Sequence, residues 1–304
     1  GIYLHLSDGR RLIDGISSWW CAALGHGRPE IAEAIARQAR ELQHSILGGL
    51  THRPAIELAA RLAERMPGDL HHVHFASDGA SAVECALKVA LQYWHNLGQP
   101  RRKRFVCLEN AYHGDTLGAI GVGFVPEFHV PFKGAVVEGL RAPSPYDPLT
   151  PFGHGLESCA PGCLAAMERI LDDYQDEIAA VIIEPVVQGA SGALIYPPAY
   201  VGWLREQCDR RGLLLIADEI AAGLGRTGRW LACDHTSTLP DIVCLGKALT
   251  GGTLPLSAMI VTDRIYDAFR SRPGENRMLY HGHTFCGNPI ACAAALAALD
   301  IFER

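Results

Sequence analysis

The sequence lacks any apolar run approaching the ~20 residues that a membrane-spanning helix needs, and it also lacks an excess of positive charge. Its 27 Lys and Arg face 33 Asp and Glu, a net charge of −6. A nucleic-acid partner is therefore not expected, because no surplus of cations is present to replace phosphate counterions. No signal-peptide pattern stands at the start, and we expect a cytoplasmic protein with neither a nucleic-acid nor a membrane partner.

The sequence also lacks the cysteine spacing of a disulfide framework or a zinc module. Its ten cysteines are scattered along 304 residues, a pattern typical of free thiols in a reducing compartment. Cys159 and Cys163 are close together, but no second pair follows them. We therefore expect no metal site.

The length and the two ends suggest how the chain is organised. A chain of 304 residues, nearly half of them apolar, predicts a globular protein with two packed regions. We expect a peripheral N-terminal segment over 1–44, a large domain over 45–290, and over 291–304 the start of a helix that leads to a further small domain. The sequence has no initiator methionine, and its last stretch reads as a helix without a cap or stop signal. We therefore expect both ends to be cut.

Short apolar runs alternate with helical stretches along most of the chain. Continuous apolar runs separated by helices predict an α/β fold with a mostly parallel sheet covered on both faces. A hairpin is expected near the start, over 3–14, and a long loop over 136–162. The expected strands are 105–108, 180–183, 213–217, 242–245 and 258–261, and the expected helices are 29–42, 55–66, 80–94, 163–174, 199–211 and 291–304.

Chemically active residues follow four of these predicted strands. Ligands of open α/β sheets bind at the carboxyl ends of the strands. The four strands lead to Tyr112-His113, Glu184, Asp218-Glu219 and Lys247. Each position alone is explained by a charged residue marking the end of a strand. The four together indicate a site.

The combination of an amine and a carboxylate suggests a specific chemistry. Lys247 stands between Gly246 and Ala248, and partial burial lowers a lysine pKa and makes the amine nucleophilic. Such a lysine forms Schiff bases with carbonyls. If the carbonyl is pyridoxal phosphate, an anionic partner must keep the ring nitrogen protonated, and Asp218 fits that role. Tyr112 is placed to stack on the ring.

A phosphate group would need hydrogen-bond donors. The turn Ser77-Asp78-Gly79-Ala80-Ser81 runs into a predicted helix, whose first N–H groups form an anion site. A helix N-cap formed by Ser77 or Asp78, without any bound anion, explains the same residues equally well.

Other motifs are better explained by structure than by chemistry. Gly223–Gly228 contains G-x-G-x-x-G, but it follows an acidic strand end and opens no βαβ unit, so a dinucleotide site is rejected. His71, His72 and His74 are interpreted as partly exposed strand residues, because no carboxylate or cysteine lies near them in sequence. Trp19 and Trp20 read as core aromatics on composition alone.

Four motifs resemble the class III aminotransferases of the pyridoxal-phosphate fold type I. They are ADEIAAGLGRTG (217–228), LGKALTGG (245–252), AVIIEPVVQGASG (180–192) and AYHGDT (111–116). The resemblance extends over essentially the whole chain. It implies a homodimeric enzyme in which Lys247 carries the cofactor as a Schiff base and moves the proton.

The resemblance assigns roles to further residues. Asp218 would pair with the pyridine nitrogen, Ile220 would pack on the ring, and Tyr112 and His113 would lie over it, with Asp115 in the same loop. Gly79 and Ala80 would offer N–H groups to the phosphate, and Thr284 would reach the phosphate of the neighbouring subunit. Glu184 would lie near the cofactor, and Arg226 receives no role. An apolar substrate channel would be lined by Trp19, Trp20 and Tyr112, next to Lys247.

Four more motifs are similar to the branch of this family that acts in biotin biosynthesis. They are DGISSWW (14–20), GGLTHRPAIELA (48–59), ALQYW (90–94) and HGHTFCGNPIACAAA (281–295). The tandem tryptophan distinguishes this branch from ornithine and 4-aminobutyrate aminotransferases. It implies S-adenosylmethionine as amino donor, although some relatives use lysine, and 8-amino-7-oxononanoate as acceptor.

Two alternatives and two departures accompany this assignment. The alternatives are another class III ω-aminotransferase and a non-catalytic scaffold with the same fold. Ala80 stands where many relatives place a hydroxyl, which weakens one expected phosphate contact. The family's carboxylate-binding arginine, expected in a C-terminal small domain, and its N-terminal tyrosine near the substrate fall outside these residues.

Overall fold

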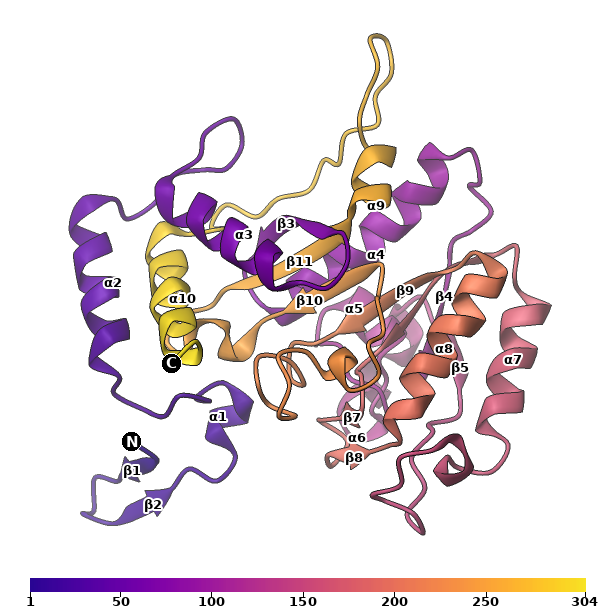
Figure 1. Ribbon diagram of the computed structural model, residues 1–304, viewed down its shortest axis with the longest axis horizontal. Coiled ribbons are helices and arrows are strands. Elements are labelled where there is room, and N and C mark those ends of the chain that lie inside the picture. Colours follow the sequence, from indigo (N-terminus) through magenta and orange to yellow (C-terminus); the bar gives the residue numbers. More distant parts are fainter.

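The computed structural model describes residues 1–304 and centres on one seven-stranded sheet (Figure 1). The strand order is β3-β11-β10-β9-β6-β4-β5. Strand β11 is antiparallel to both of its neighbours, and the other pairs are parallel. The strands are β3 (Leu70–Ala76), β4 (Arg104–Leu108), β5 (Leu140–Ala142), β6 (Ile178–Ile183), β9 (Leu214–Asp218), β10 (Ile242–Leu245) and β11 (Ser257–Thr262).

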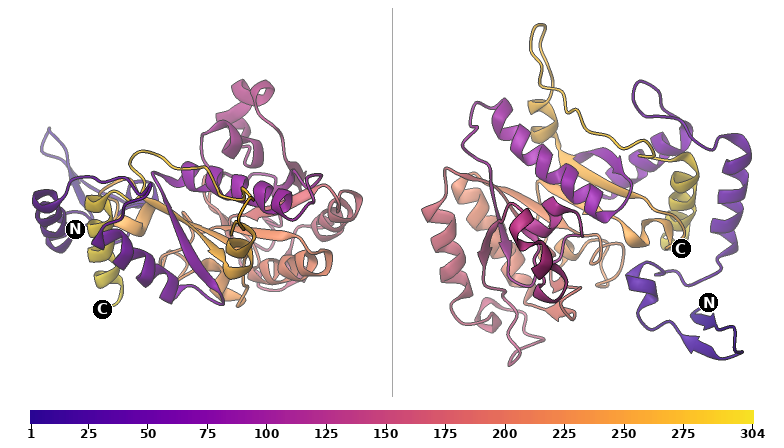
Figure 2. Two further views of the ribbon diagram at one scale, coloured as in Figure 1. Left: turned by 90° about the horizontal axis from the view of Figure 1, so that it is seen from above. Right: turned by 180° about the vertical axis from the view of Figure 1, so that it is seen from behind.

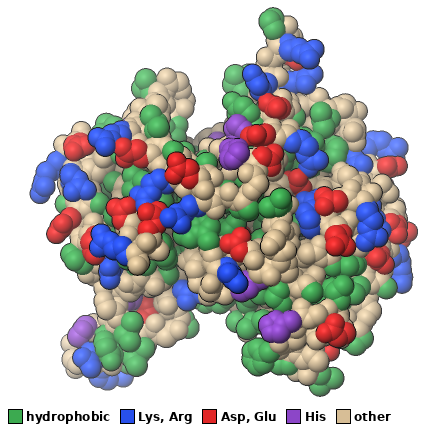
Figure 3. Space-filling view, viewed as in Figure 1, with side chains coloured by type: hydrophobic (Ala, Val, Ile, Leu, Met, Phe, Trp, Pro, Cys, Tyr) green, Lys and Arg blue, Asp and Glu red, His purple; other side chains and the backbone are tan.

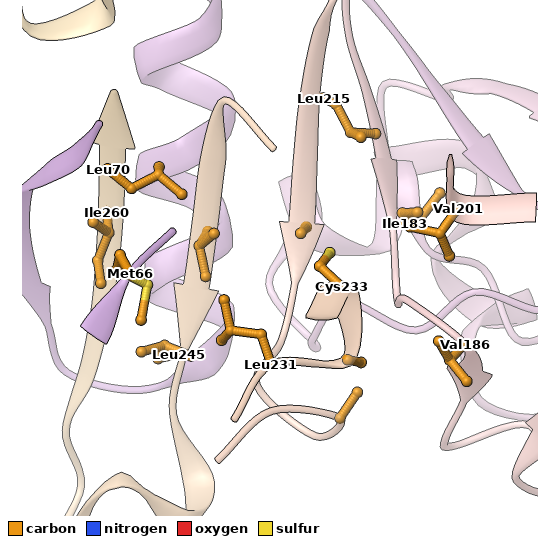
Figure 4. Close-up of a cluster of buried hydrophobic side chains, with 14 of the residues drawn as sticks. Met66, Leu70, Ile183, Val186, Val201, Leu215, Leu231, Cys233, Leu245 and Ile260 are labelled. Carbon is orange, nitrogen blue, oxygen red and sulfur yellow. The ribbon is translucent and has the colours of Figure 1, made fainter. Parts of the chain in front are cut away.

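Both faces of this sheet are buried, which explains why its strands read as unbroken apolar runs. Every residue of β6, β9, β10 and β11 is buried. Alternate side chains point to opposite faces; Leu215, Leu245 and Ile260 join one apolar cluster (Figure 4). Ile216 and Cys244 join a second cluster on the other face.

Helices cover the two faces unequally (Figure 2). Helix α4 packs over the second cluster, whereas α3, α7, α8 and α10 supply side chains to the first. The helices are α2 (Pro29–Glu41), α3 (Arg53–Arg65), α4 (Gly79–Asn96), α5 (Leu117–Val122), α6 (Pro126–His129), α7 (Cys163–Asp173), α8 (Pro198–Arg211), α9 (Asp263–Ala268) and α10 (Pro289–Phe302).

Short elements complete the fold. A small hairpin of β7 (Val187–Gln188) and β8 (Leu194–Ile195) follows β6. The 3₁₀ turns are η1 (Val130–Ala135), η2 (Leu156–Ser158), η3 (Ala232–His235) and η4 (Lys247–Thr250).

The fold class is as predicted, with corrections in detail. All five expected strands form, and β10 has the expected bounds. The predicted long loop contains β5, a strand too short to show a pattern. The last helix does have a cap, contrary to the prediction: it begins at Pro289, and the Asn288 side chain accepts hydrogen bonds from the N–H groups of Ile290 and Ala291.

The first fifty residues lie at the periphery. A hairpin of β1 (Tyr3–His5) and β2 (Arg11–Ile13) forms as expected, but all its strand residues are exposed. The turn α1 (Ser17–Trp20) has a left-handed backbone, and α2 packs on α10. A notch separates the hairpin from the main body in the space-filling view (Figure 3). No helix has the length and hydropathy needed to cross a bilayer.

Candidate active site

The sheet register brings the predicted strand ends together. Ile183 pairs with Ala217, so Glu184 follows at the level of Asp218. Asp218 in turn pairs with Cys244, three residues before Lys247. Two carboxylates and an amine from three adjacent strands therefore reach one edge of the sheet, as the sequence predicted.

Asp218 is buried and fixed in orientation. Its side chain is 5% exposed, and Oδ2 lies 2.7 Å from Nδ1 of His113. The backbone N–H of Ile220 donates to Oδ1 at 3.1 Å. A buried carboxylate held in one orientation by an imidazole can pair with a protonated ring nitrogen. The His113 side chain is fully buried against Asp218, and its position over the ring stays a prediction.

Glu184 organises the loop that carries Tyr112. Its Oε2 accepts from the N–H of Tyr112 and its Oε1 from the N–H of Gly189, both at 2.9 Å. Burial raises the pKa of Glu184 to about 7, helped by the negative charge of Asp218, while His113 and the two N–H groups act in the opposite direction. Because both oxygens are already engaged, Glu184 positions its neighbours.

Glu219, next to Asp218, points to a different environment. Its two oxygens accept from the N–H groups of Ala232 and Cys233 at 2.8 and 2.9 Å. Burial is the main reason that its pKa rises to about 7. Glu219 therefore anchors η3 from inside the protein and takes no part in the site.

Lys247 stands alone at the end of β10. Its ammonium makes no hydrogen bond or ion pair, and its backbone adopts a left-handed conformation with φ +42°. Gly246 precedes it because a Cβ there would lie 3.2 Å from Ile220. A partly buried amine without a carboxylate partner is available for covalent chemistry.

Ile220 forms the floor between the amine and the start of α4. A Cβ on Gly79 would lie 3.1 Å from the Ile220 side chain, and one on Gly246 would lie 3.2 Å from it. Ile220 therefore lies between Gly246, which precedes Lys247, and the turn before α4; its packing on a ring stays a prediction.

The turn before α4 has two free donors. Asp78 caps the helix by accepting from the N–H of Ser81 at 2.9 Å, so the N-cap reading of the sequence is correct. The N–H groups of Gly79 and Ala80 donate to no other group. The cap and the anion site therefore coexist, because the cap uses a different N–H.

Tyr112 is held in place by its own loop. Its hydroxyl donates to Asp115 at 2.9 Å, and its ring stacks on His129 with centroids 5.9 Å apart. Burial and the Asp115 carboxylate raise the pKa of Tyr112. The following Gly114 has no room for a side chain, because a Cβ there would lie 2.4 Å from that of Ala80. The ring-stacking loop and the phosphate turn are thus in contact.

The two tryptophans separate. Trp20 lies against the Glu184 region, since a Cβ on Gly189 would lie 3.0 Å from its ring. Arg226 places its guanidinium 5.9 Å from the Trp20 ring centroid and donates to its carbonyl. Trp19 is 80% exposed. The sequence predicted a tandem lining, but the left-handed turn α1 directs only Trp20 toward the site; neither Arg226 nor Gly189 carried a signal for this contact.

Thr284 lies on the segment that leads to α10 and is exposed. The segment touches the phosphate turn of its own chain through a Ser77 Oγ to His283 Nδ1 contact of 3.3 Å. Phe285 and Tyr280, on the same segment, are 63% and 70% exposed.

The residues brought together fit pyridoxal phosphate. They offer a free amine, a buried fixed carboxylate, an apolar floor and two unpaired N–H groups at a helix start. The predicted positions of Lys247, Asp218, Ile220, Gly79 and Ala80 all border one region.

Comparison with known proteins agrees with this fit. The family profile described as "Aminotransferase class-III" matches residues 1–304. An adenosylmethionine-8-amino-7-oxononanoate aminotransferase of Geobacter sulfurreducens is 43% identical over 304 residues, covering 100% of this chain and 67% of that protein. The protein of the same name from Synechococcus elongatus is 47% identical, covering 99% of this chain and 70% of its own length.

Solved structures show the same relation. The enzyme of that name from Methanocaldococcus jannaschii superposes with a TM-score of 0.91 at 40% identity, covering 100% of this chain and 67% of that one. An amine transaminase from an uncultivated Pseudomonas species, solved in a pyridoxal-phosphate-bound form, gives 0.91 at 39% identity, covering 100% of this chain and 69% of its own. The chain spans between 56% and 70% of the length of the curated relatives it matches. This chain belongs to the class III aminotransferases, a family of pyridoxal-phosphate enzymes.

Proposed function

We propose that the protein transfers an amino group from S-adenosylmethionine to 8-amino-7-oxononanoate, giving 7,8-diaminononanoate for biotin biosynthesis in the cytoplasm. The observation that supports these substrates is the shared name of relatives that are 37–47% identical over essentially this whole chain. The reaction type is supported by the buried Asp218 and by Lys247, which follow adjacent paired strands at one edge of the sheet.

Each residue contributes a separate task. Lys247 holds the cofactor covalently and moves the proton at the reacting carbon, as a general acid and base. Asp218, oriented by His113, keeps the pyridine nitrogen protonated. Bound pyridoxal phosphate supplies an electron sink that stabilises negative charge on the substrate carbon. The N–H groups of Gly79 and Ala80 hold the phosphate, and Ile220 packs under the ring.

The substrate side is proposed to include Trp20 and Tyr112. The Tyr112 backbone N–H donates to Glu184, and the Trp20 ring lies against Gly189, whose N–H donates to the same carboxylate. Apolar aromatic walls suit both the alkyl chain of the acceptor and the adenosyl group of the donor. Trp19 joins this channel only if another part of the molecule covers it.

A donor-exchange assay tests the substrate assignment. The full-length protein is supplied with 8-amino-7-oxononanoate and, in turn, S-adenosylmethionine, lysine or 4-aminobutyrate. Product formation with S-adenosylmethionine alone supports the proposal, and formation with lysine alone corrects the donor. Rapid turnover of 4-aminobutyrate with none of S-adenosylmethionine would overturn the biotin assignment.

The second candidate is a general ω-transaminase. An (S)-enantioselective ω-transaminase from Thermomicrobium roseum is 36% identical and superposes with a TM-score of 0.91, nearly as similar as the Methanocaldococcus enzyme. Small chiral amines as donors separate the two candidates. A non-catalytic scaffold would take up no pyridoxal phosphate and would be colourless. An aminotransferase is expected to be yellow with bound cofactor and to lose this colour in the Lys247→Ala variant.

We also propose a homodimer in which Thr284 contacts the partner's phosphate. Thr284 lies on an exposed segment between large exposed apolar side chains, Tyr280 and Phe285, of the kind that protein interfaces bury. The experiment mixes Lys247→Ala and Thr284→Ala chains at limiting cofactor. In a mixed dimer one site carries both lesions and the other carries none. Activity above that of either variant alone supports a shared site; activity equal to the mean of the two variants refutes it.

A further inference from the structure

Two histidines and a cysteine from distant parts of the chain meet on the α4 side of the sheet. His74 comes from β3, Cys85 from the second turn of α4, and His281 from the segment before α10. One ligand atom of each lies within 4.8 Å of the other two. Sequence spacing alone does not group these three residues, because 196 residues separate Cys85 from His281.

One ring nitrogen of each histidine in this cluster lacks a partner. Nε2 of His74 and Nε2 of His281 are both shielded from solvent, and neither takes part in a hydrogen bond. Buried polar atoms in proteins are nearly always paired. Two unpaired nitrogens of neighbouring rings, with centroids 5.9 Å apart, are thus an independent sign that something binds between them.

We propose that His74, Cys85 and His281 form a binding site for a transition-metal ion of the Zn²⁺ type. Imidazole and thiolate ligands favour such ions over Mg²⁺ or Ca²⁺. Zinc bonds of ~2.0–2.1 Å to nitrogen and ~2.3 Å to sulfur place tetrahedral ligands roughly 3.5 Å apart, so small side-chain rotations close the observed spacing. Water or His283, whose ring centroid is 5.3 Å from that of His281, completes the fourth position.

Lys88 regulates how tightly this site binds. Its Nζ lies 3.1 Å from Nδ1 of His281. When Nε2 of His281 binds a metal, Nδ1 carries the proton, and an ammonium cannot accept it. Lys88 is exposed, so its long side chain must turn into solvent. Its positive charge also disfavours a second cation nearby.

The metal would join three elements around the phosphate turn. The turn Ser77–Ser81 connects β3 to α4, and Ser77 contacts His283 of the third element. An ion bound by His74, Cys85 and His281 would therefore fix the segment that carries Thr284 relative to the start of α4.

The test uses the cofactor-loaded full chain, stripped with a chelator and dialysed against Co²⁺. Bound cobalt is measured by elemental analysis and by the visible d–d bands of tetrahedral Co²⁺. The native protein is expected to hold one Co²⁺ per chain, and Cys85→Ala and His74→Gln are expected to lose it. The matched controls, Cys292→Ala and His71→Gln, remove a fully buried helical thiol and an exposed β3 imidazole, and both keep the ion.

A variant that binds Co²⁺ more tightly cannot be explained by misfolding, so it complements the variants that lose the ion. Lys88→Gln removes the charge and supplies an amide oxygen that accepts from Nδ1, so cobalt affinity is expected to rise about tenfold. Any Co²⁺ bound by the cofactor itself is present equally in the native chain and in every variant, so it does not affect the difference in bound Co²⁺ between them. The proposal is overturned if the native chain holds no more Co²⁺ than Cys85→Ala, or if Lys88→Gln binds no tighter than the native chain.

Discussion

The edge of the central sheet and the first fifty residues differ sharply in how they hold their functional side chains. At the sheet edge, Asp218, His113 and Glu184 are buried and joined to one another's loops by hydrogen bonds of 2.7 to 2.9 Å. In the N-terminal segment, the hairpin strands are exposed throughout, and Trp19 is 80% exposed. The sheet edge is fixed by the chain's own packing, whereas the hairpin and Trp19 have few partners within these residues.

This contrast separates the two tasks of a transaminase. Binding and activating the cofactor requires rigid groups, which the buried strands supply. Receiving two different substrates in turn requires an adaptable wall. The segment that carries Trp19 and Trp20 reaches the site through the Trp20 ring, which lies near Gly189, and through the Cys21 backbone, which lies near Gly252. Variants in the two regions should therefore affect different kinetic constants.

The largest expected effect comes from the two adjacent carboxylates. Asp218→Asn removes the anion that keeps the ring nitrogen protonated, and kcat is expected to fall by about 10²- to 10⁴-fold. Glu219→Gln is the matched control, because it changes a neighbouring buried acid that binds only N–H groups of η3. Its kcat should stay within about twofold of the native value. Equal losses in both variants would mean that Asp218 has only a structural role.

A smaller effect is expected in the substrate wall. Trp20→Ala should raise KM for S-adenosylmethionine by between about 10- and 100-fold, because an apolar contact is lost from ground state and transition state alike. Trp19→Ala is the matched comparison. An increase in its KM would indicate that another part of the full-length protein covers the Trp19 ring and brings it into the substrate site. A Trp20→Ala enzyme with unchanged KM and reduced kcat would contradict a role in binding.

A still smaller loss of activity is expected when Asp218 is no longer held in its orientation. His113→Asn leaves the carboxylate in place but removes its 2.7 Å contact, so kcat should fall about tenfold, less than for a group that acts directly. The absorbance of the bound cofactor, followed across pH, reports whether the ring nitrogen still holds its proton. His52→Asn, which changes a buried histidine that caps α3 and contacts the carbonyl of Gly287, is the control. An unchanged titration in His113→Asn would refute the orienting role.

Much of this arrangement could be predicted because it depends on local sequence. The strand Ile242–Leu245 and the lysine two residues beyond it follow from an apolar run ended by glycine. The contact of Asp218 with His113 could not be predicted, because it joins residues 105 positions apart through the register of three strands. Glu219 looked like a second site carboxylate; only the alternation of side chains along β9 shows that it points elsewhere.

The positions of the tryptophans and of the α4 histidine cluster depend on equally distant contacts. The four consecutive residues Ser17 to Trp20 have positive φ, and this turn points the two rings in different directions. None of the four is a glycine, so the sequence does not predict the turn. His74 lacked a metal-ligand partner nearby in sequence. Cys85 lies near it because α4 packs against β3, and His281 lies near it because the segment before α10 returns to the same face of the sheet.

The smallest effect concerns the stability of the sheet edge. Burial raises the pKa of Glu219 from its ordinary value of 4.5 to about 7. Between these values the unfolded chain has released the proton and the folded chain retains it, so the free energy of unfolding should fall as pH rises through this window.

Denaturant unfolding of the native chain and of Glu219→Gln across this window measures the slope. The variant lacks the titration, so its stability should depend less on pH, although it is less stable at low pH because an amide NH₂ cannot accept from Ala232 or Cys233. Glu64→Gln, on the exposed side of α3, controls for the loss of one surface charge. A Glu219→Gln slope as steep as the native one would place the pH dependence elsewhere, and Glu184, the other buried acid with a pKa of about 7, would be tested next.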